Sequence, residues 1–135
     1  MTSLEQQTRQ LGAALQQDPA WIRYREAQAA AVADTELQAL LSEFETAQLR
    51  YTQYARRLTA EQDPETLASL EQRAVELYET IRTHHTMAEL DMAQEAWQQV
   101  YQNTFGILEA CADGEDPETC APKEVQSCAS CGGCG

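Results

Sequence analysis

The fold is indicated most clearly by residues 34–58, which read DTELQALLSEFETAQLRYTQYARRL. Apolar residues recur there every seven positions, at Leu37, Phe44, Tyr51 and Leu58. Heptad spacing of this kind predicts a helix with a packing seam along one side. A helix over 35–61 would be roughly 40 Å long, which is more than a compact bundle of this size needs. We therefore expect an elongated antiparallel bundle that leaves apolar surface for another subunit.

The rest of residues 1–110 also reads as helix. Ala, Gln, Glu, Leu and Arg dominate this region and are good helix formers, while β-hairpin signals are missing. The expected helix starts are Asp18 before Pro19, Asp34, Asp63 before Pro64, and Thr86 with Glu89 as a capping box. The predicted helices cover residues 3–17, 20–33, 35–61, 64–83 and 87–110. The prediction is an all-α bundle of about five helices with a long third helix, followed by a non-regular cysteine-rich tail.

Apolar stripes at helical spacing are normally core or subunit contacts, and we assign them so here. The residues predicted to form the interface are Leu37, Phe44, Tyr51, Leu58 and Trp97.

The charge of the chain excludes one class of function. The chain contains nine Lys and Arg residues and 22 Asp and Glu residues, so its net charge is −13. Lys123 is the only lysine. A protein that binds nucleic acid unaided needs a face rich in Lys and Arg. No apolar stretch approaches the roughly 20 residues of a membrane span, and the N-terminus lacks the pattern of a signal peptide. We expect a cytoplasmic protein with no direct nucleic-acid or membrane contact.

Residues 1–110 contain no recognisable catalytic set. There is no Gly-x-Ser-x-Gly elbow, Gly-rich phosphate loop or His-Glu-x-x-His motif. A di-iron bundle needs Glu-x-x-His pairs, but Ile81 and Arg82 stand three residues before His84 and His85. We predict a capping or solvent role for these histidines and no enzymatic activity.

The cysteines are confined to the end of the chain. All five lie in residues 111–135, which divides the chain into a helical domain, 1–110, and a flexible Cys- and Gly-rich tail, 111–135. Cys128, Cys131 and Cys134 recur every third residue, as in the opening of runs that ligate iron–sulfur clusters. Cys120 is the expected fourth ligand, with Cys111 or a partner's residue as the alternative.

Other readings of the thiols remain open. Zinc would be satisfied by Cys120, Cys128, Cys131 and Cys134. A disulfide framework is disfavoured by the odd number of cysteines and the expected cytoplasmic location. The remaining alternatives are a reduced tail that binds nothing and a tail whose thiols are redox-active.

The helical domain resembles the YlbF/YmcA family over nearly all of residues 1–110. The matching residues are Leu11-Gly12, Trp21-x-x-Tyr24-x-x-Ala27, Asp34-x-Glu36-Leu37-Gln38-x-Leu40-Leu41-x-x-Phe44 with Gln48, and Met87-Ala88-Glu89-Leu90-x-x-Ala93-Gln94. The chain departs from the family at His84-His85-Thr86, where many relatives have Asn-Pro, and in the number of its tail cysteines.

The resemblance implies a non-enzymatic regulatory adaptor. In spore-forming bacteria, YlbF and YmcA associate with YaaT in a complex that binds [4Fe–4S] clusters and a flavin and supports competence, biofilm formation and sporulation. The complex is described both as a specificity factor for ribonuclease Y and as an accelerator of the sporulation phosphorelay. The expected partners are a second copy of the chain or YmcA/YaaT-like proteins, and the expected cofactor is a [4Fe–4S] cluster. The alternatives are a zinc-stabilised or metal-free helical oligomerisation module and an iron–sulfur carrier or electron-transfer protein.

Overall fold

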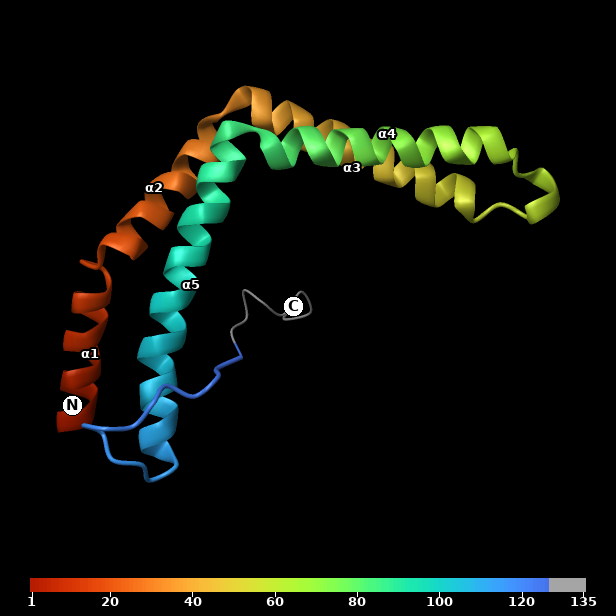
Figure 1. Cartoon of the computed structure of the whole chain (residues 1–135). Coiled ribbons are helices and arrows are strands. Elements are labelled where there is room, and N and C mark those ends of the chain that lie inside the picture. The colour runs from red at the N-terminus through yellow and green to blue at the C-terminus, as the bar shows by residue number, and fades with distance from the viewer. Residues whose placement is uncertain (127–135) are drawn as a thin grey trace. The chain divides into compact units, whose positions relative to one another are not determined.

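The computed structural model describes residues 1–126, and within them every regular element is helical (Figure 1). The elements are α1 (Ser3–Leu15), α2 (Pro19–Ala33), α3 (Thr35–Ala55), a 3-10 turn η1 (Thr59–Glu61), α4 (Pro64–Thr83) and α5 (His85–Ala112). The predicted all-α class with five helices is confirmed.

Three predicted helix starts are occupied by capping aspartates. Asp18 accepts a hydrogen bond from the backbone N–H of Ala20, and Asp34 accepts one from that of Leu37. Asp63 caps α4 ahead of Pro64, where the missing N–H of proline costs no helical hydrogen bond. These short polar side chains satisfy N–H groups that have no partner within the helix.

The third helix is shorter than predicted. It ends at Ala55 and not at residue 61, because the Gln62 side-chain amide donates to the carbonyls of Ala55 and Arg57 and stabilises a turn there. Its 21 residues span roughly 32 Å. The longest helix among residues 1–126 is α5, with 28 residues. Leu58 therefore lies outside α3 and does not continue its heptad seam.

The fifth helix begins earlier than predicted, at His85. The expected capping box of Thr86 with Glu89 is wrong, because the Thr86 hydroxyl donates to the Asp34 carboxylate at 2.6 Å. The ring Nδ1 of His84 instead accepts the Thr86 backbone N–H, at 3.3 Å. His84 thus has the capping role predicted for the histidine pair.

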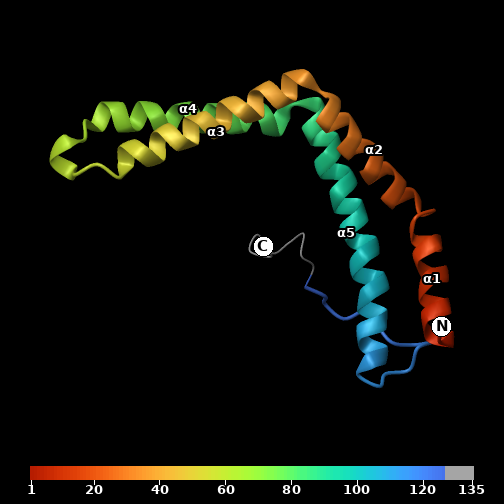
Figure 2. The ribbon, with the colours of Figure 1, turned by 180° about the vertical axis from the view of Figure 1, so that it is seen from behind.

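The chain forms two compact units, which are described separately. One contains Arg23–Met92 and the other contains Met1–Ile22 with the residues from Ala93 onward. In the first, α3 and α4 lie side by side as an antiparallel hairpin (Figures 1 and 2). Its core consists of Ala31, Leu37 and Ile81, covered by Leu40, Leu41, Phe44, Met87 and Leu90.

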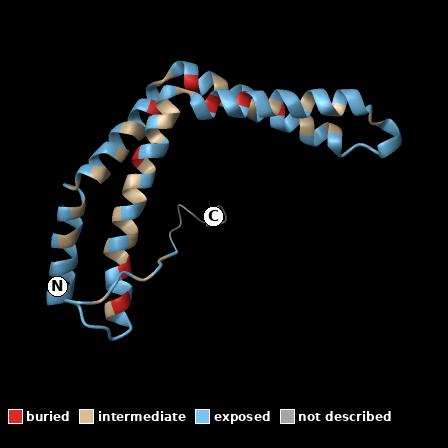
Figure 3. Cartoon of the chain, in the orientation of Figure 1, coloured by how far each residue is buried: buried red, intermediate tan, exposed pale blue. Residues whose placement is uncertain are grey.

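In the second unit the buried residues are small. Ala93, Gly106 and Ala110 of α5 are buried, whereas α1 has no buried residue (Figure 3). Beyond α5 the chain turns back, and residues 120–125, which we call the strap, lie along the helix. The Lys123 N–H donates to the Gly106 carbonyl at 3.0 Å. Gly106 is required here, because a Cβ at this position would collide with the Lys123 carbonyl oxygen.

Candidate functional site

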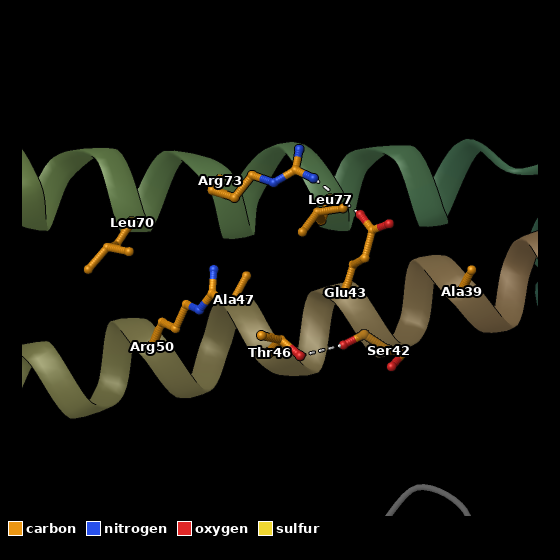
Figure 4. A pocket seen from close by; sticks show the side chains of 9 residues that line it. All are labelled: Ala39, Ser42, Glu43, Thr46, Ala47, Arg50, Leu70, Arg73 and Leu77. Atoms are coloured by element: carbon orange, nitrogen blue, oxygen red, sulfur yellow. Dashed lines mark hydrogen bonds and ion pairs between the residues drawn. The ribbon is translucent and has the colours of Figure 1, made fainter.

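One face of the α3–α4 hairpin carries a groove with charged walls (Figure 4). Ala47 and Leu77 form its buried floor, and Glu43 pairs with Arg73 across it at 3.1 Å. Both members of this ion pair are more than half exposed, so water screens the pair and its contribution to stability is small. The groove is lined by Ala39, Ser42, Glu43, Thr46, Ala47, Arg50, Leu70, Arg73 and Leu77.

A second groove lies between the same two helices and is lined by aromatic and apolar side chains together with Gln48, Thr52 and Glu71. It contains Phe44 and Tyr51, two of the residues predicted to form the interface, together with Tyr78 and Val75 of α4. The rings of Phe44 and Tyr78 are 6.1 Å apart, while Tyr78 and Val75 stay 52% and 54% exposed. The two grooves use different helical positions, so they occupy different faces of the hairpin.

The other three predicted interface residues are not part of this groove. Leu37 is fully buried in the core, so within this protein it has no surface left for a partner. Leu58 is 72% exposed in the loop after α3. Trp97 lies on α5 in the other unit, where its ring and that of Tyr101 have centroids 6.3 Å apart and are steeply inclined to each other. The interface itself stays a prediction, and Phe44 and Tyr51 are the members of the set that share one groove.

A polar network joins the starts of α3 and α5. The Asp34 carboxylate accepts hydrogen bonds from the Thr86 hydroxyl and the Leu37 N–H, and these bonds hold the pKa of Asp34 below its usual range. The Nε2 atom of His84 lies 3.8 Å from the same carboxylate, and the His84 side chain is only 8% exposed. The sequence marked Asp34 as a cap, but its bond to Thr86 joins residues 52 positions apart and has no local signal.

Two of the predicted metal ligands lie together at the end of α5. Cys111 and Cys120 are both free cysteines and partly buried, and they lie close enough for the Cys111 thiol to act on that of Cys120. Burial raises the pKa of the Cys120 thiol, and the neighbouring Cys111 thiol and Glu115 raise it further. The three remaining predicted ligands, Cys128, Cys131 and Cys134, lie outside the described residues. Among residues 1–126, no group of three potential metal ligands converges.

The residues that hold Cys120 in place were missed by sequence reasoning. The Gln102 side chain donates to the Val125 carbonyl at 2.7 Å and accepts the Val125 N–H at 3.0 Å. The Lys123 ammonium pairs with Asp113 and Glu115, and these carboxylates raise its pKa. Gly106, the only glycine between residues 13 and 113, was the one available hint that something approaches α5 closely.

These features define a small all-helical protein with grooves and exposed apolar side chains on its helices. A family model described as "Control of competence regulator ComK, YlbF/YmcA" matches residues 4–110. The chain therefore belongs to the YlbF/YmcA family, a family of regulators, as its helix motifs predicted. Comparison with curated proteins and with solved structures gave no match. No helix within residues 1–126 is long and apolar enough to cross a membrane.

Proposed function

We propose that the protein is a non-enzymatic adaptor in a cytoplasmic regulatory complex, and that its C-terminal cysteines bind an iron–sulfur cluster. The observation that carries the proposal is the Cys111–Cys120 thiol pair in a chain that belongs to the YlbF/YmcA family. Family membership supports the regulatory role and protein partners. The thiol pair supports a metal centre made by this chain.

The aromatic groove of the hairpin is the proposed partner surface. Large apolar side chains that stay exposed beside partly buried rings, as Val75 and Tyr78 do beside Phe44 and Tyr51, are typical of protein contact sites. The occupant that we propose is a second copy of the hairpin or the corresponding hairpin of a YmcA-like partner. Packing of two hairpins would bury the stripe that one hairpin leaves open.

The described residues fit the cluster in part. Iron–sulfur clusters are held by cysteine thiolates, and Cys111 and Cys120 bring two thiols to one place. Cys128, Cys131 and Cys134 would supply the remaining ligands. When bound, a cluster of this kind supplies electron transfer or a response to iron and oxidants. The raised pKa of Cys120 means that its thiol keeps its proton at neutral pH, so ligation must displace that proton.

The charge of the chain constrains the partner. At −13 the protein repels phosphates, so a role in RNA processing would require a partner with a basic surface. We propose that a YaaT-like partner, or a nuclease that the complex directs, supplies this positive charge. Association would then weaken as salt is raised.

Anaerobic purification followed by absorption spectroscopy and iron and sulfide analysis tests the cluster. We expect a coloured protein with iron and acid-labile sulfide, and loss of both in Cys131→Ser. A colourless protein with stoichiometric zinc would support the zinc-stabilised module instead. Absence of both metals would overturn the cofactor proposal.

Sedimentation analysis tests the partner surface separately. Val75→Arg places a charge in the aromatic groove, and we expect it to lower the association of the chain with itself or with a YmcA-like partner. Val32→Arg is the matched control, because Val32 is 77% exposed on α2, away from the groove. Equal association of the two variants would exclude this groove as the contact.

A further inference from the structure

The chain reverses direction directly after Cys111. The Gly114 N–H donates to the Cys111 carbonyl at 3.0 Å, and the Glu115 N–H donates to the Ala110 carbonyl at 3.1 Å. Gly114 adopts φ of 89°, a left-handed value that glycine reaches at no steric cost and that commonly ends a helix. A second turn closes when the Cys120 N–H donates to the Asp116 carbonyl at 2.9 Å. Cys111 and Cys120 thus stand at the two ends of a well-bonded loop.

The register of the strap places Cys120 beside Cys111. Lys123 is hydrogen-bonded to Gly106, and Val125 is hydrogen-bonded to Gln102. An advance of two residues along the strap therefore matches four residues along α5. This ratio agrees with the rise of roughly 3.3 Å per extended residue and 1.5 Å per helical residue. Continued back from Lys123 to Cys120, the same register reaches the end of α5, where Cys111 lies. The effect of the Cys111 thiol on the pKa of Cys120 agrees with this placement.

We propose that Cys111 and Cys120 are a redox-active dithiol, which low-molecular-weight disulfides such as oxidised glutathione convert to an intramolecular disulfide. One cysteine thiolate attacks the small disulfide, whose S–S bond breaks and releases one small thiol. The second cysteine then attacks the mixed disulfide on the protein sulfur and releases the other small thiol. The two cysteines lose two electrons and two protons, and the two small thiols carry both away. The reaction needs no iron–sulfur cluster, so it stands independently of the proposed cofactor.

The geometry suits this reaction because little movement is needed. A disulfide requires Cα atoms about 4.4–6.8 Å apart. The register of the strap brings Cys120 to the end of α5 that carries Cys111, so closure requires only a local adjustment of the loop between them. The backbone contacts of the strap with Gly106 and Gln102 lie outside the loop that the disulfide would close, whereas Asp113, which pairs with Lys123, lies within it. Oxidation would also withdraw both thiols from any metal, which would make the pair a switch on cluster loading.

The positions of the basic residues make the reaction simple to map in the intact chain. Arg82 and Lys123 are consecutive sites for trypsin, so peptide 83–123 carries Cys111 and Cys120, while peptide 124–135 carries the three tail cysteines. After reduced, metal-free protein is treated with oxidised glutathione, we expect peptide 83–123 to lose two hydrogens. Cleavage before Asp113 and Asp116 should then leave two fragments joined until they are reduced. Glutathione left on Cys111 or Cys120, a link between the two tryptic peptides, or unreacted thiols would each overturn the proposal.

Gly106→Ala tests whether the strap positions the pair. The new Cβ collides with the Lys123 carbonyl, so the strap must move and we expect closure to slow by about tenfold or more. Gly12→Ala is the matched control, since nothing lies within 4 Å of that position. Gln102→Ala removes two strap hydrogen bonds without adding bulk and should slow closure in the same direction. Closure in both strap variants at the rate of Gly12→Ala would show that the strap does not bring the thiols together.

Discussion

The backbone N–H of Lys123 donates to the carbonyl of Gly106 across 17 positions of sequence. A helix carbonyl normally accepts a hydrogen bond from the N–H four residues further along its own helix. A strap that also bonds to such a carbonyl must approach the helix backbone closely. Only a residue without a side chain allows that approach. The contact orders the chain after α5 and determines where Cys120 lies.

Replacing Gly106 with alanine should release the strap. Alanine favours helix, so α5 itself should persist and the helical circular dichroism should stay unchanged. We expect trypsin to cut after Lys123 about tenfold faster, because proteolysis follows local opening and Lys123 is otherwise tied to α5 by its N–H and its ammonium group. Gly12→Ala should leave the rate at Lys123 unchanged and raise stability by about 0.5–1 kcal/mol. Equal cleavage in the two variants would contradict this account of the strap.

Leu37 should be among the most sensitive positions in the hairpin. Its side chain is fully buried between Ala31 and Ile81, so Leu37→Ala leaves a cavity and should lower the free energy of unfolding by about 2–5 kcal/mol. Leu49→Ala on the same helix removes a side chain that is 57% exposed. It should change the free energy of unfolding by less than about 0.5 kcal/mol. Urea unfolding followed by circular dichroism measures both. Similar losses in the two variants would contradict the placement of the core.

Asp34 should make stability depend on acid pH. The Thr86 hydroxyl and the Leu37 N–H lower its pKa in the folded state, so the ionised carboxylate stabilises the fold above its ordinary pKa of 3.8. This contribution is lost as the pH falls through the lower, folded-state pKa. Asp34→Asn should therefore be less stable at neutral pH and should lose less stability on acidification.

Thermal unfolding at a series of pH values between about 7 and 2 checks the Asp34 prediction. Thr86→Val removes the hydroxyl that contributes most to the lowered pKa, and it should shift the acid transition upward. Asp91→Asn, on the exposed surface of α5, serves as the control. An acid profile of Asp34→Asn that matches the wild type would show that this carboxylate is not responsible.

The Cys120 thiol should react slowly at neutral pH. Burial and the Cys111 thiol raise its pKa, and the thiolate is the reactive form. Alkylation by iodoacetamide should therefore be slower in the folded chain than in urea, and it should accelerate as the pH rises above the ordinary thiol pKa of 9.0. Because the folded-state pKa is raised, the stability linked to this thiol is present below pH 9.0 and is lost at higher pH. Mass spectrometry of peptide 83–123 after cleavage before Asp113 and Asp116, which separates Cys120 from Cys111, gives the rate at Cys120. Equal rates in folded and unfolded chains would contradict the environment described.

Much of the fold was predictable because its signals are local. Asp34 and Asp63 cap the helices that they precede, and the apolar spacing of Leu37, Phe44 and Tyr51 follows one side of α3. The end of α3 was not predictable in the same way. It depends on the Gln62 side chain reaching back to Ala55, which no spacing rule anticipates. Thr86 was misjudged for a similar reason, since its partner Asp34 is distant in sequence.

The thiol site was also predictable only in part. The sequence showed that five cysteines gather after residue 110 and that a thiolate ligand set was available. It could not show that Cys120 meets Cys111, because that contact depends on Lys123, Val125 and the helix positions to which they bond.

By itself, then, the sequence determined the helical class, the family and the kinds of ligand atom that are available. Helix propensity, capping and apolar periodicity carry this information because they act within a few residues. Only the tertiary structure decided that Leu37 is core, that Phe44 and Tyr51 share a groove with Tyr78, and that the Cys111 and Cys120 thiols lie near each other. Those outcomes depend on contacts between distant segments, whose energies are comparable for many alternative pairings until the chain has folded.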